Sequence, residues 1–235
     1  MLNFEWVLEY SELFIEGISV TIQLLLISAF FGFLLAAAVG FARLSKVKWI
    51  AWPALCFTQL IRGTPLLVQI FILYYGLGSW FSEWPLLQES WMWQYLREGF
   101  WYIALALILS VGAYVGEVIR SGLKAVPRGE LEAARALGMS KLIVMRRIWF
   151  PRAIHLMLPT LAGETVLLLK STALASTVAV TDLLGSANFV RAQTLITYEP
   201  LITVALVYMV LAWIIEKLFS MIEKKVPNRT QASMS

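Results

Sequence analysis

Long runs of apolar residues, separated by short polar segments, dominate the pattern along the chain. Three of these runs, 17–42, 63–82 and 99–116, contain no Asp, Glu, Lys or Arg. About 20 apolar residues are enough for a helix to cross the hydrocarbon core of a bilayer. The pattern therefore predicts an all-α, multi-span transmembrane helical bundle. Its five expected spans cover roughly 16–42, 51–78, 99–120, 153–174 and 199–220.

The composition favours a membrane protein over a soluble one. Hydrophobic residues make up 60% of the 235 positions and charged residues only 14%, whereas an ordinary soluble domain has about one quarter charged residues. We expect one transmembrane domain over 1–225 and a flexible cytoplasmic tail over 226–235. A single cysteine, Cys56, and a single histidine, His155, exclude a disulfide framework, and no metal site is expected.

The distribution of basic residues predicts the orientation in the membrane. Of the 19 Lys and Arg residues, 15 lie in 43–48, 120–152 and 217–229. Basic segments stay on the cytoplasmic side, so we expect the N-terminus outside and the C-terminus inside. The net charge of +4 follows from this topology, and the expected surroundings are membrane lipid and not nucleic acid.

The residues before the first span carry only acidic charge. Glu5, Glu9, Glu12 and Glu16 are spaced so that they share one face of a helix. This pattern predicts an amphipathic helix on the outer surface, and contact with an extracytoplasmic partner is the alternative. No basic region precedes the first span, so a cleavable signal peptide is not expected.

The inner loop 120–152 has an ordered pattern of its own. Glu130 to Leu137 favours a short helix, Gly138 is a natural stop, and a basic, apolar segment resumes at 141–150 until Pro151. Three small residues reduce the bulk of this helix, namely Ala133, Ala134 and Ala136. Such a surface allows close approach by another protein. The alternative is a loop that only joins two spans.

The spacing in this loop resembles a known family signature. Glu132-Ala133-Ala134, three residues, Gly138, nine residues, Ile148, one residue and Phe150-Pro151 resemble the loop of bacterial ABC importer permeases, with Phe150 in place of the more usual leucine. Three further segments resemble the polar amino-acid and opine, or histidine-type, subfamily: I-R-G-T-P-L-L-V-Q (61–69), A-Y-V-G-E-V-I-R-S-G-L (113–123) and L-L-K-S-T-A-L-A-S (168–176). Ser171, where Asp is commonest, is similar to histidine- and opine-type permeases and favours a basic amino acid or opine as substrate.

The resemblance implies a type I importer permease fold, a set of partners and a location in the bacterial inner membrane. The partners are two ABC ATPase subunits, a second identical or homologous permease and a periplasmic solute-binding protein. The loop helix is then the coupling helix, with ATPase contacts through Glu130, Glu132, Ala133, Ala134 and Gly138. The chain has no G-x-x-x-x-G-K-[ST] phosphate loop. We therefore expect no enzymatic activity and no cofactor, with ATP bound by the partner subunit and transport by alternating access.

Charged residues inside the expected spans are the candidates for substrate contact. A charge at the bilayer centre costs about 2.5–3.5 kcal/mol or more, and both Arg62 and Glu164 fall near the midplane. Arg62 is suited to the carboxylate of an amino acid and Glu164 to its ammonium. The same path is expected to include Thr64, Ser171 and Thr172. The alternative is a structural pair between Arg62 and Glu164, within one subunit or across a permease dimer.

Two features of the third span have a structural interpretation. Glu117 and Arg120 lie three residues apart, on one helix face, and are expected to form a structural ion pair. Gly112, Gly116 and Gly122 form a stripe of small residues suited to close helix packing.

Two other classes of function fit the sequence less well than an ATP-driven importer. An ion-coupled secondary transporter or channel would suit the intramembrane charges, but it gives the 120–152 loop no role, and internal symmetry is not apparent. A membrane-bound enzyme would need a convergent nucleophile–base or metal set, which the sequence lacks.

Overall fold

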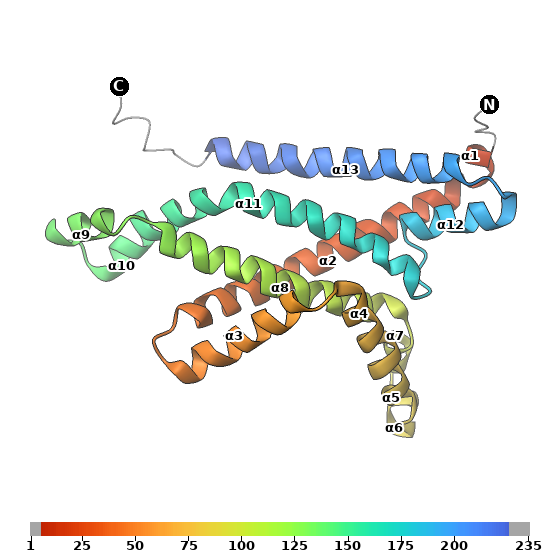
Figure 1. The fold of residues 1–235 in the computed structure, drawn as a ribbon, viewed down its shortest axis with the longest axis horizontal. Coiled ribbons are helices and arrows are strands. Elements are labelled where there is room, and N and C mark those ends of the chain that lie inside the picture. The colour runs from red at the N-terminus through yellow and green to blue at the C-terminus, as the bar shows by residue number, and fades with distance from the viewer. Residues whose placement is uncertain (1–5, 226–235) are drawn as a thin grey trace.

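The computed structural model describes residues 6–225, and all regular secondary structure in this range is helical (Figure 1). Four of its helical segments are long and apolar enough to cross a membrane: Ser11–Leu44, Gly99–Ala125, Lys141–Thr177 and Tyr198–Lys225. A bent pair, Lys48–Gly63 with Leu66–Ser82, makes a fifth span if it is counted as one. The predicted tail at 226–235 lies outside the described residues.

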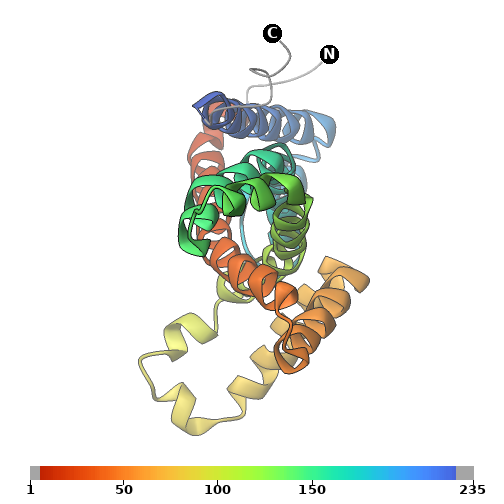
Figure 2. The same cartoon turned by 90° about the vertical axis from the view of Figure 1, so that its left-hand side faces the viewer.

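The helices that form the bundle are α2 (Ser11–Leu44), α8 (Gly99–Ala125), α11 (Phe150–Ser171) and α13 (Tyr198–Lys225). Viewed end-on, α8 and α11 lie at the centre, with α13 on one side and α3 (Lys48–Gly63) on the other (Figure 2). The largest helix–helix contact is between α2 and α8. The main apolar core lies between these two helices, around Leu24, Ile103 and Leu107.

Glycines make the contact between α2 and α8 close. A Cβ at Gly32 would lie 2.6 Å from Cβ of Val111, and one at Gly112 would lie 2.5 Å from Cδ2 of Leu35. Gly116 packs against Val39 in the same way. The stripe of small residues expected in the third span therefore does face another helix.

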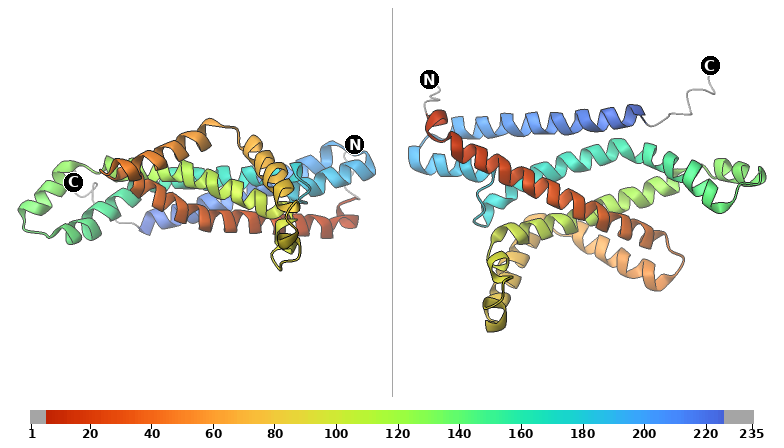
Figure 3. Two further views of the ribbon diagram at one scale, coloured as in Figure 1. Left: turned by 90° about the horizontal axis from the view of Figure 1, so that it is seen from below. Right: turned by 180° about the vertical axis from the view of Figure 1, so that it is seen from behind.

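The second expected span is broken. After α3 the chain turns at Thr64-Pro65 into α4 (Leu66–Phe71), a π-helical turn η1 (Ile72–Leu77) and α5 (Gly78–Ser82), with an angle of 105° between the two parts (Figure 3). The expected span over 51–78 is therefore present as a bent pair, and its two parts extend from Lys48 to Ser82. Pro65 has no N–H and cannot continue the hydrogen bonding of α3.

The fourth span starts earlier than predicted. The helix does not stop at Pro151, because α10 (Lys141–Val144) runs through a π-helical turn η2 (Met145–Trp149) into α11. Pro151 lies in the first turn of α11, where the missing N–H is tolerated, and the π-turn rearranges the preceding hydrogen bonds.

The N-terminal residues also differ from the expectation of a surface helix. Only one turn, α1 (Trp6–Glu9), precedes α2, and both Glu12 and Glu16 belong to α2 itself. Trp6 is buried and its ring centroid lies 5.5 Å from that of Phe14. Glu5 lies outside the described residues.

The connections between the helices lie at the two ends of the bundle, and their positions agree with the distribution of basic residues. The α2–α3 connection, the short helices α9 (Arg128–Ala136) and α10, and the end of α13 lie at one end, on the left of Figure 1. At the other end lie α1, α12 (Leu183–Thr194) and the segment with α6 (Pro85–Gln88) and α7 (Trp93–Leu96). The basic segments predicted to be cytoplasmic thus share one side. Helix α12 was not predicted.

Candidate functional site

A cavity of about 250 Å³ lies where α2, α4, α8 and α11 meet. Its walls are mostly apolar, and Leu66 on α4 contributes to them. Its polar lining comes from Ser110 and Tyr114 on α8 and from Glu164 and Ser171 on α11. The size is just below the range of about 300–1,000 Å³ for small-molecule sites. A carboxylate in a mostly apolar cavity suits a small cationic solute.

Arg62 and Glu164 lie near the same cavity. Glu164 is half-buried on α11, and Arg62 is exposed at the end of α3 with its guanidinium carbon 5.2 Å from the centroid of the Tyr114 ring. The charge of Arg62 is close enough to act on Glu164. Within residues 6–225, however, the two form no ion pair. The structural ion pair inside one subunit, which was the alternative, is therefore not seen between these two side chains.

The three hydroxyl residues expected on this path fall in different places. Ser171 lines the cavity and donates to the carbonyl of Leu167 at 2.8 Å. Thr64 is exposed at the break between α3 and α4. Thr172 is fully buried, and its hydroxyl lies 3.5 Å from that of Tyr208 on α13. Thr172 therefore belongs to a polar cluster on the other side of α11 and not to the lining of the cavity.

Two residues at this site were not singled out from the sequence. Tyr114 supplies an aromatic face for the Arg62 guanidinium, a cation–π arrangement. Gln69 donates from its side-chain amide to the carbonyl of Ile61 at 2.8 Å, across the break. The signal for Gln69 was Pro65, since a proline inside a helix leaves a carbonyl without its usual donor.

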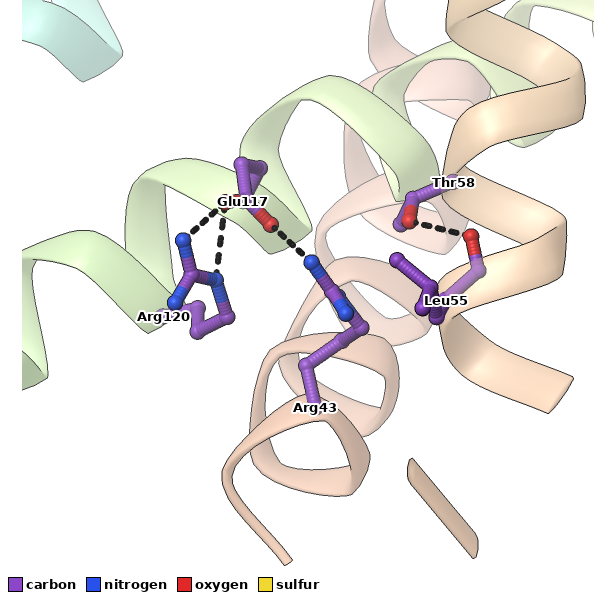
Figure 4. A network of polar contacts seen from close by, with 5 residues as sticks. All are labelled: Arg43, Leu55, Thr58, Glu117 and Arg120. Atoms are coloured by element: carbon purple, nitrogen blue, oxygen red, sulfur yellow. Dashed lines mark hydrogen bonds and ion pairs between the residues drawn. The ribbon is translucent and has the colours of Figure 1, made fainter. Parts of the chain in front are cut away.

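The inner end of α8 carries the expected Glu117–Arg120 ion pair, with a second arginine added. Arg120 donates to Glu117 from Nε at 2.8 Å, and Arg43 of α2 donates to the other carboxylate oxygen at 3.3 Å (Figure 4). One carboxylate between two guanidiniums ties the end of α2 to α8. This arrangement is structural. Among the described residues there is no group of His, Cys, Asp and Glu that could hold a metal ion.

The expected loop helix is present as α9, and Gly138 ends it. Gly138 has φ of +78°, and its N–H donates to Arg135 while that of Met139 donates to Ala134. This is the Schellman arrangement, which favours glycine because of the positive φ.

One face of α9 is exposed and the other packs against its own chain. The exposed face, spaced at helical intervals, consists of Gly129, Glu132, Ala133, Ala136 and Leu137. Leu137, the residue that follows α9, is 79% exposed. Ala134 is only 3% exposed and faces inward, so it does not add to the partner surface as expected. Glu130 pairs with Arg152 at 3.2 Å and also acts within the chain.

The chain is similar to known proteins over most of its length. Residues 19–227 match the family described as binding-protein-dependent transport system inner membrane component. The octopine transport system permease protein OccM of Rhizobium meliloti is 40% identical over 209 residues, which cover 89% of this chain and 84% of OccM. The histidine/lysine/arginine/ornithine transport system permease protein HisM of Escherichia coli K12 is 34% identical over 209 residues, which cover 89% of this chain and 87% of HisM.

Solved structures with the same fold are also known. A crystal structure of an amino acid ABC transporter with histidines superposes with a TM-score of 0.81 at 32% identity, covering 96% of this chain and 99% of that chain. The MetNI methionine ABC transporter superposes with a TM-score of 0.73 at 15% identity, covering 96% of this chain and 100% of the other. The second likeness shows the fold alone.

Proposed function

The chain belongs to the family of binding-protein-dependent transport system inner membrane components. We propose that it is the permease through which an ATP-driven importer carries basic amino acids or opines. Family membership makes it a multi-pass inner-membrane permease subunit and implies an ATPase and a binding protein as partners. The printed substrates of OccM and HisM, octopine and histidine, lysine, arginine and ornithine, support the substrate class.

The observation that carries the proposal is Glu164 in a mostly apolar cavity with no ion-pair partner among the described residues. A half-buried carboxylate in mostly apolar surroundings attracts a cation more strongly than a carboxylate in water does. A basic amino acid has two cationic groups, its α-ammonium group and its side chain, and one of the two would contact Glu164. Its carboxylate would be held by the Arg62 guanidinium, which can bind in a bidentate manner. Ser171 adds a hydroxyl to the same lining.

The test is Glu164→Gln in the complex of permease, ATPase and binding protein, reconstituted in liposomes. We expect uptake of radiolabelled L-arginine to fall by about tenfold, a loss of about 1.4 kcal/mol, while the binding protein still stimulates ATP hydrolysis. Glu216→Gln is the matched control, because Glu216 is an exposed residue of α13 that does not line the cavity. Unchanged arginine uptake with intact ATPase stimulation would remove Glu164 from the substrate path.

A second permease is the partner proposed for the exposed side of the cavity. Arg62 and Thr64 are both exposed next to it, although they lie in the middle of an expected span. Exposed polar groups at that depth are costly against lipid, which supports cover by another protein. Purification of the complex with two different tags on the permease distinguishes a homodimer, which retains both tags, from a pair of paralogues.

The exposed face of α9 is the surface proposed for the ATPase. Small residues allow close approach, and Leu137 offers an apolar contact at its end. We expect Ala133→Phe to reduce co-purification of the ATPase, because the added ring occupies the space of the partner. Ala192→Phe is the matched control, at an exposed position of α12, which lies at the other end of the bundle. Equal recovery of the ATPase from both variants would contradict this docking surface.

A further inference from the structure

The break between α3 and α4 leaves backbone carbonyls without helical partners. In an α-helix the carbonyl of Ile61 accepts from the N–H of the residue four positions later, and that residue is Pro65. Pro65 has no N–H, so the carbonyl needs another donor. Inside a membrane an unsatisfied backbone group costs several kcal/mol, and neighbouring side chains commonly satisfy such groups.

Gln69 supplies the missing donor. Its amide nitrogen lies 2.8 Å from the carbonyl oxygen of Ile61, 3.1 Å from that of Thr64 and 2.8 Å from the hydroxyl oxygen of Thr64. The Thr64 hydroxyl in turn donates to the carbonyl of Leu60 at 2.9 Å. A single side chain on α4 is thereby linked to three groups on the last turn of α3 and the residue after it.

The orientation of the Gln69 amide follows from these partners. The two carbonyl oxygens can only accept a hydrogen bond, so the nitrogen and not the oxygen of the amide must face them. Oε1 of Gln69 is buried and has no hydrogen-bond partner among the described residues. The amide nitrogen of Gln69 therefore holds the two helices together. A carboxylate of the same shape would place an oxygen against the three acceptor oxygens of Ile61 and Thr64.

The joined segments carry two groups of the cavity. Arg62, at the end of α3, lies over the Tyr114 ring, and Leu66, at the start of α4, forms part of the cavity wall. Their relative position depends on the angle of 105° between the two helices. We propose that Gln69 is a positioning residue of the substrate path, whose amide replaces the N–H that Pro65 lacks and fixes the angle that sets Arg62 at the cavity.

The geometric test measures the angle directly in the purified complex. Spin labels are attached to Trp52→Cys on α3 and Ile72→Cys after α4, at positions that are 67% and 63% exposed, with the exposed Cys56 changed to Ser. We expect one narrow distance distribution for the parent protein. Gln69→Met keeps the length of the side chain but has no donor, so we expect a broader distribution shifted to longer distance. Gln23→Met, on α2, is the control, since Gln23 bonds only to Ser19 of its own helix among the described contacts.

The functional test separates positioning from a general role in folding. For Gln69→Met we expect the amount of L-arginine transported per ATP hydrolysed to fall by at least about fivefold. The concentration of arginine-loaded binding protein that gives half-maximal ATPase activity should stay within twofold of the parent value. The reason is that the docking surfaces at both ends of the bundle are unchanged, while the residues around the cavity are displaced.

Two results would overturn the proposal. One is an unchanged distance distribution in Gln69→Met. The other is a parallel loss of complex assembly, ATPase activity and transport, which would indicate a folding role only. The inference rests on the proposed function for its transport readout, but the distance measurement does not. If Glu164→Gln leaves arginine uptake unchanged, the distance measurement still tests whether Gln69 fixes the angle between α3 and α4.

Discussion

Glu130 on α9 and Arg152 on α11 form an ion pair with an N–O distance of 3.2 Å. The pair joins the exposed loop helix to the same span that carries Glu164 and Ser171 further along. With the ATPase docked on α9 as proposed, a displacement of α9 would reach the cavity through α11. The Glu130 side chain is 37% exposed and that of Arg152 20%, so the pair contributes at most about 1 kcal/mol to stability.

We predict that Glu130→Gln reduces coupling more than it reduces stability. The midpoint of thermal unfolding should hardly change, whereas arginine uptake per ATP hydrolysed should fall by up to about fivefold, the effect of a coupling energy near 1 kcal/mol. Both quantities can be measured on one preparation in liposomes. The double exchange Glu130→Arg with Arg152→Glu restores the opposite charges and should recover much of the coupling. Equal coupling in the parent and Glu130→Gln would show that the ion pair plays no part.

Close packing between α2 and α8 gives a prediction about stability. In Gly32→Ala the new methyl group would lie 2.6 Å from the branched Cβ of Val111, which cannot move aside easily. We expect a loss of about 1–3 kcal/mol, as for other overpacked positions, seen as a lower unfolding temperature in detergent. Gly163→Ala is the matched control, because nothing lies within 4 Å of its added methyl group. If the two variants unfold at the same temperature, the helices are not packed as closely as described.

The spans were predictable because their signal is redundant. Each needs only a long apolar run, and the charges between the runs limit where a span can end, so α2, α8 and α13 appear within a few residues of their predicted places. Local breaks in the helices were harder to predict. Pro65 and Pro151 both interrupt apolar stretches of the sequence, yet the chain bends at Pro65 and continues as a helix through a π-turn before Pro151. Which outcome occurs depends on tertiary contacts that no local pattern contains.

The candidate site was predictable in part for the same reason. Arg62 and Glu164 stand out because a charge inside a span is costly wherever it lies. Ser171 and Thr172 are adjacent in sequence, but one lines the cavity and the other is buried on the far side of α11. Adjacent residues of a helix point about 100° apart, and which of the two faces the cavity depends on how this segment packs against its neighbours. The burial of Ala134 could not be predicted for a similar reason, since it depends on how α9 packs on its own loop.

Gly138 gives a prediction about the loop that is independent of the ATPase. Because φ is +78°, any L-residue with a Cβ is strained there, at a cost of about 1 kcal/mol. Gly138→Ala should therefore open the end of α9 and speed trypsin cleavage at Arg135 and Lys141 by about fivefold, since cleavage follows local opening. Gly129→Ala, inside α9, should leave cleavage unchanged or slow it, because alanine favours a helix. Faster cleavage in both variants, or in neither, would contradict the stated role of the positive φ.

Asp182 is a fully buried acid at the start of α12, between the fourth and fifth spans. One carboxylate oxygen accepts from the N–H of Gly185 at 2.9 Å, and the other accepts from the hydroxyl of Tyr208 at 3.4 Å. Burial away from water is the largest influence and raises the pKa of Asp182 from 3.8 to about 6, although these hydrogen bonds oppose the increase. The neutral form is therefore favoured in the folded protein more than in the unfolded chain.

This shift predicts that the free energy of unfolding decreases as the pH rises from about 4 to about 6. In that window the folded state keeps a proton that the unfolded state has released, so the slope of stability against pH is negative, and above the folded pKa it levels off. A shift of about two units corresponds to about 3 kcal/mol. Asp182→Asn keeps an oxygen for Gly185 but cannot ionise, so its stability at pH 7 should equal or exceed that of the parent. Unfolding followed by tryptophan fluorescence in detergent from pH 4 to 8 measures both curves. If the variant loses as much stability as the parent across this window, Asp182 is not the titrating group.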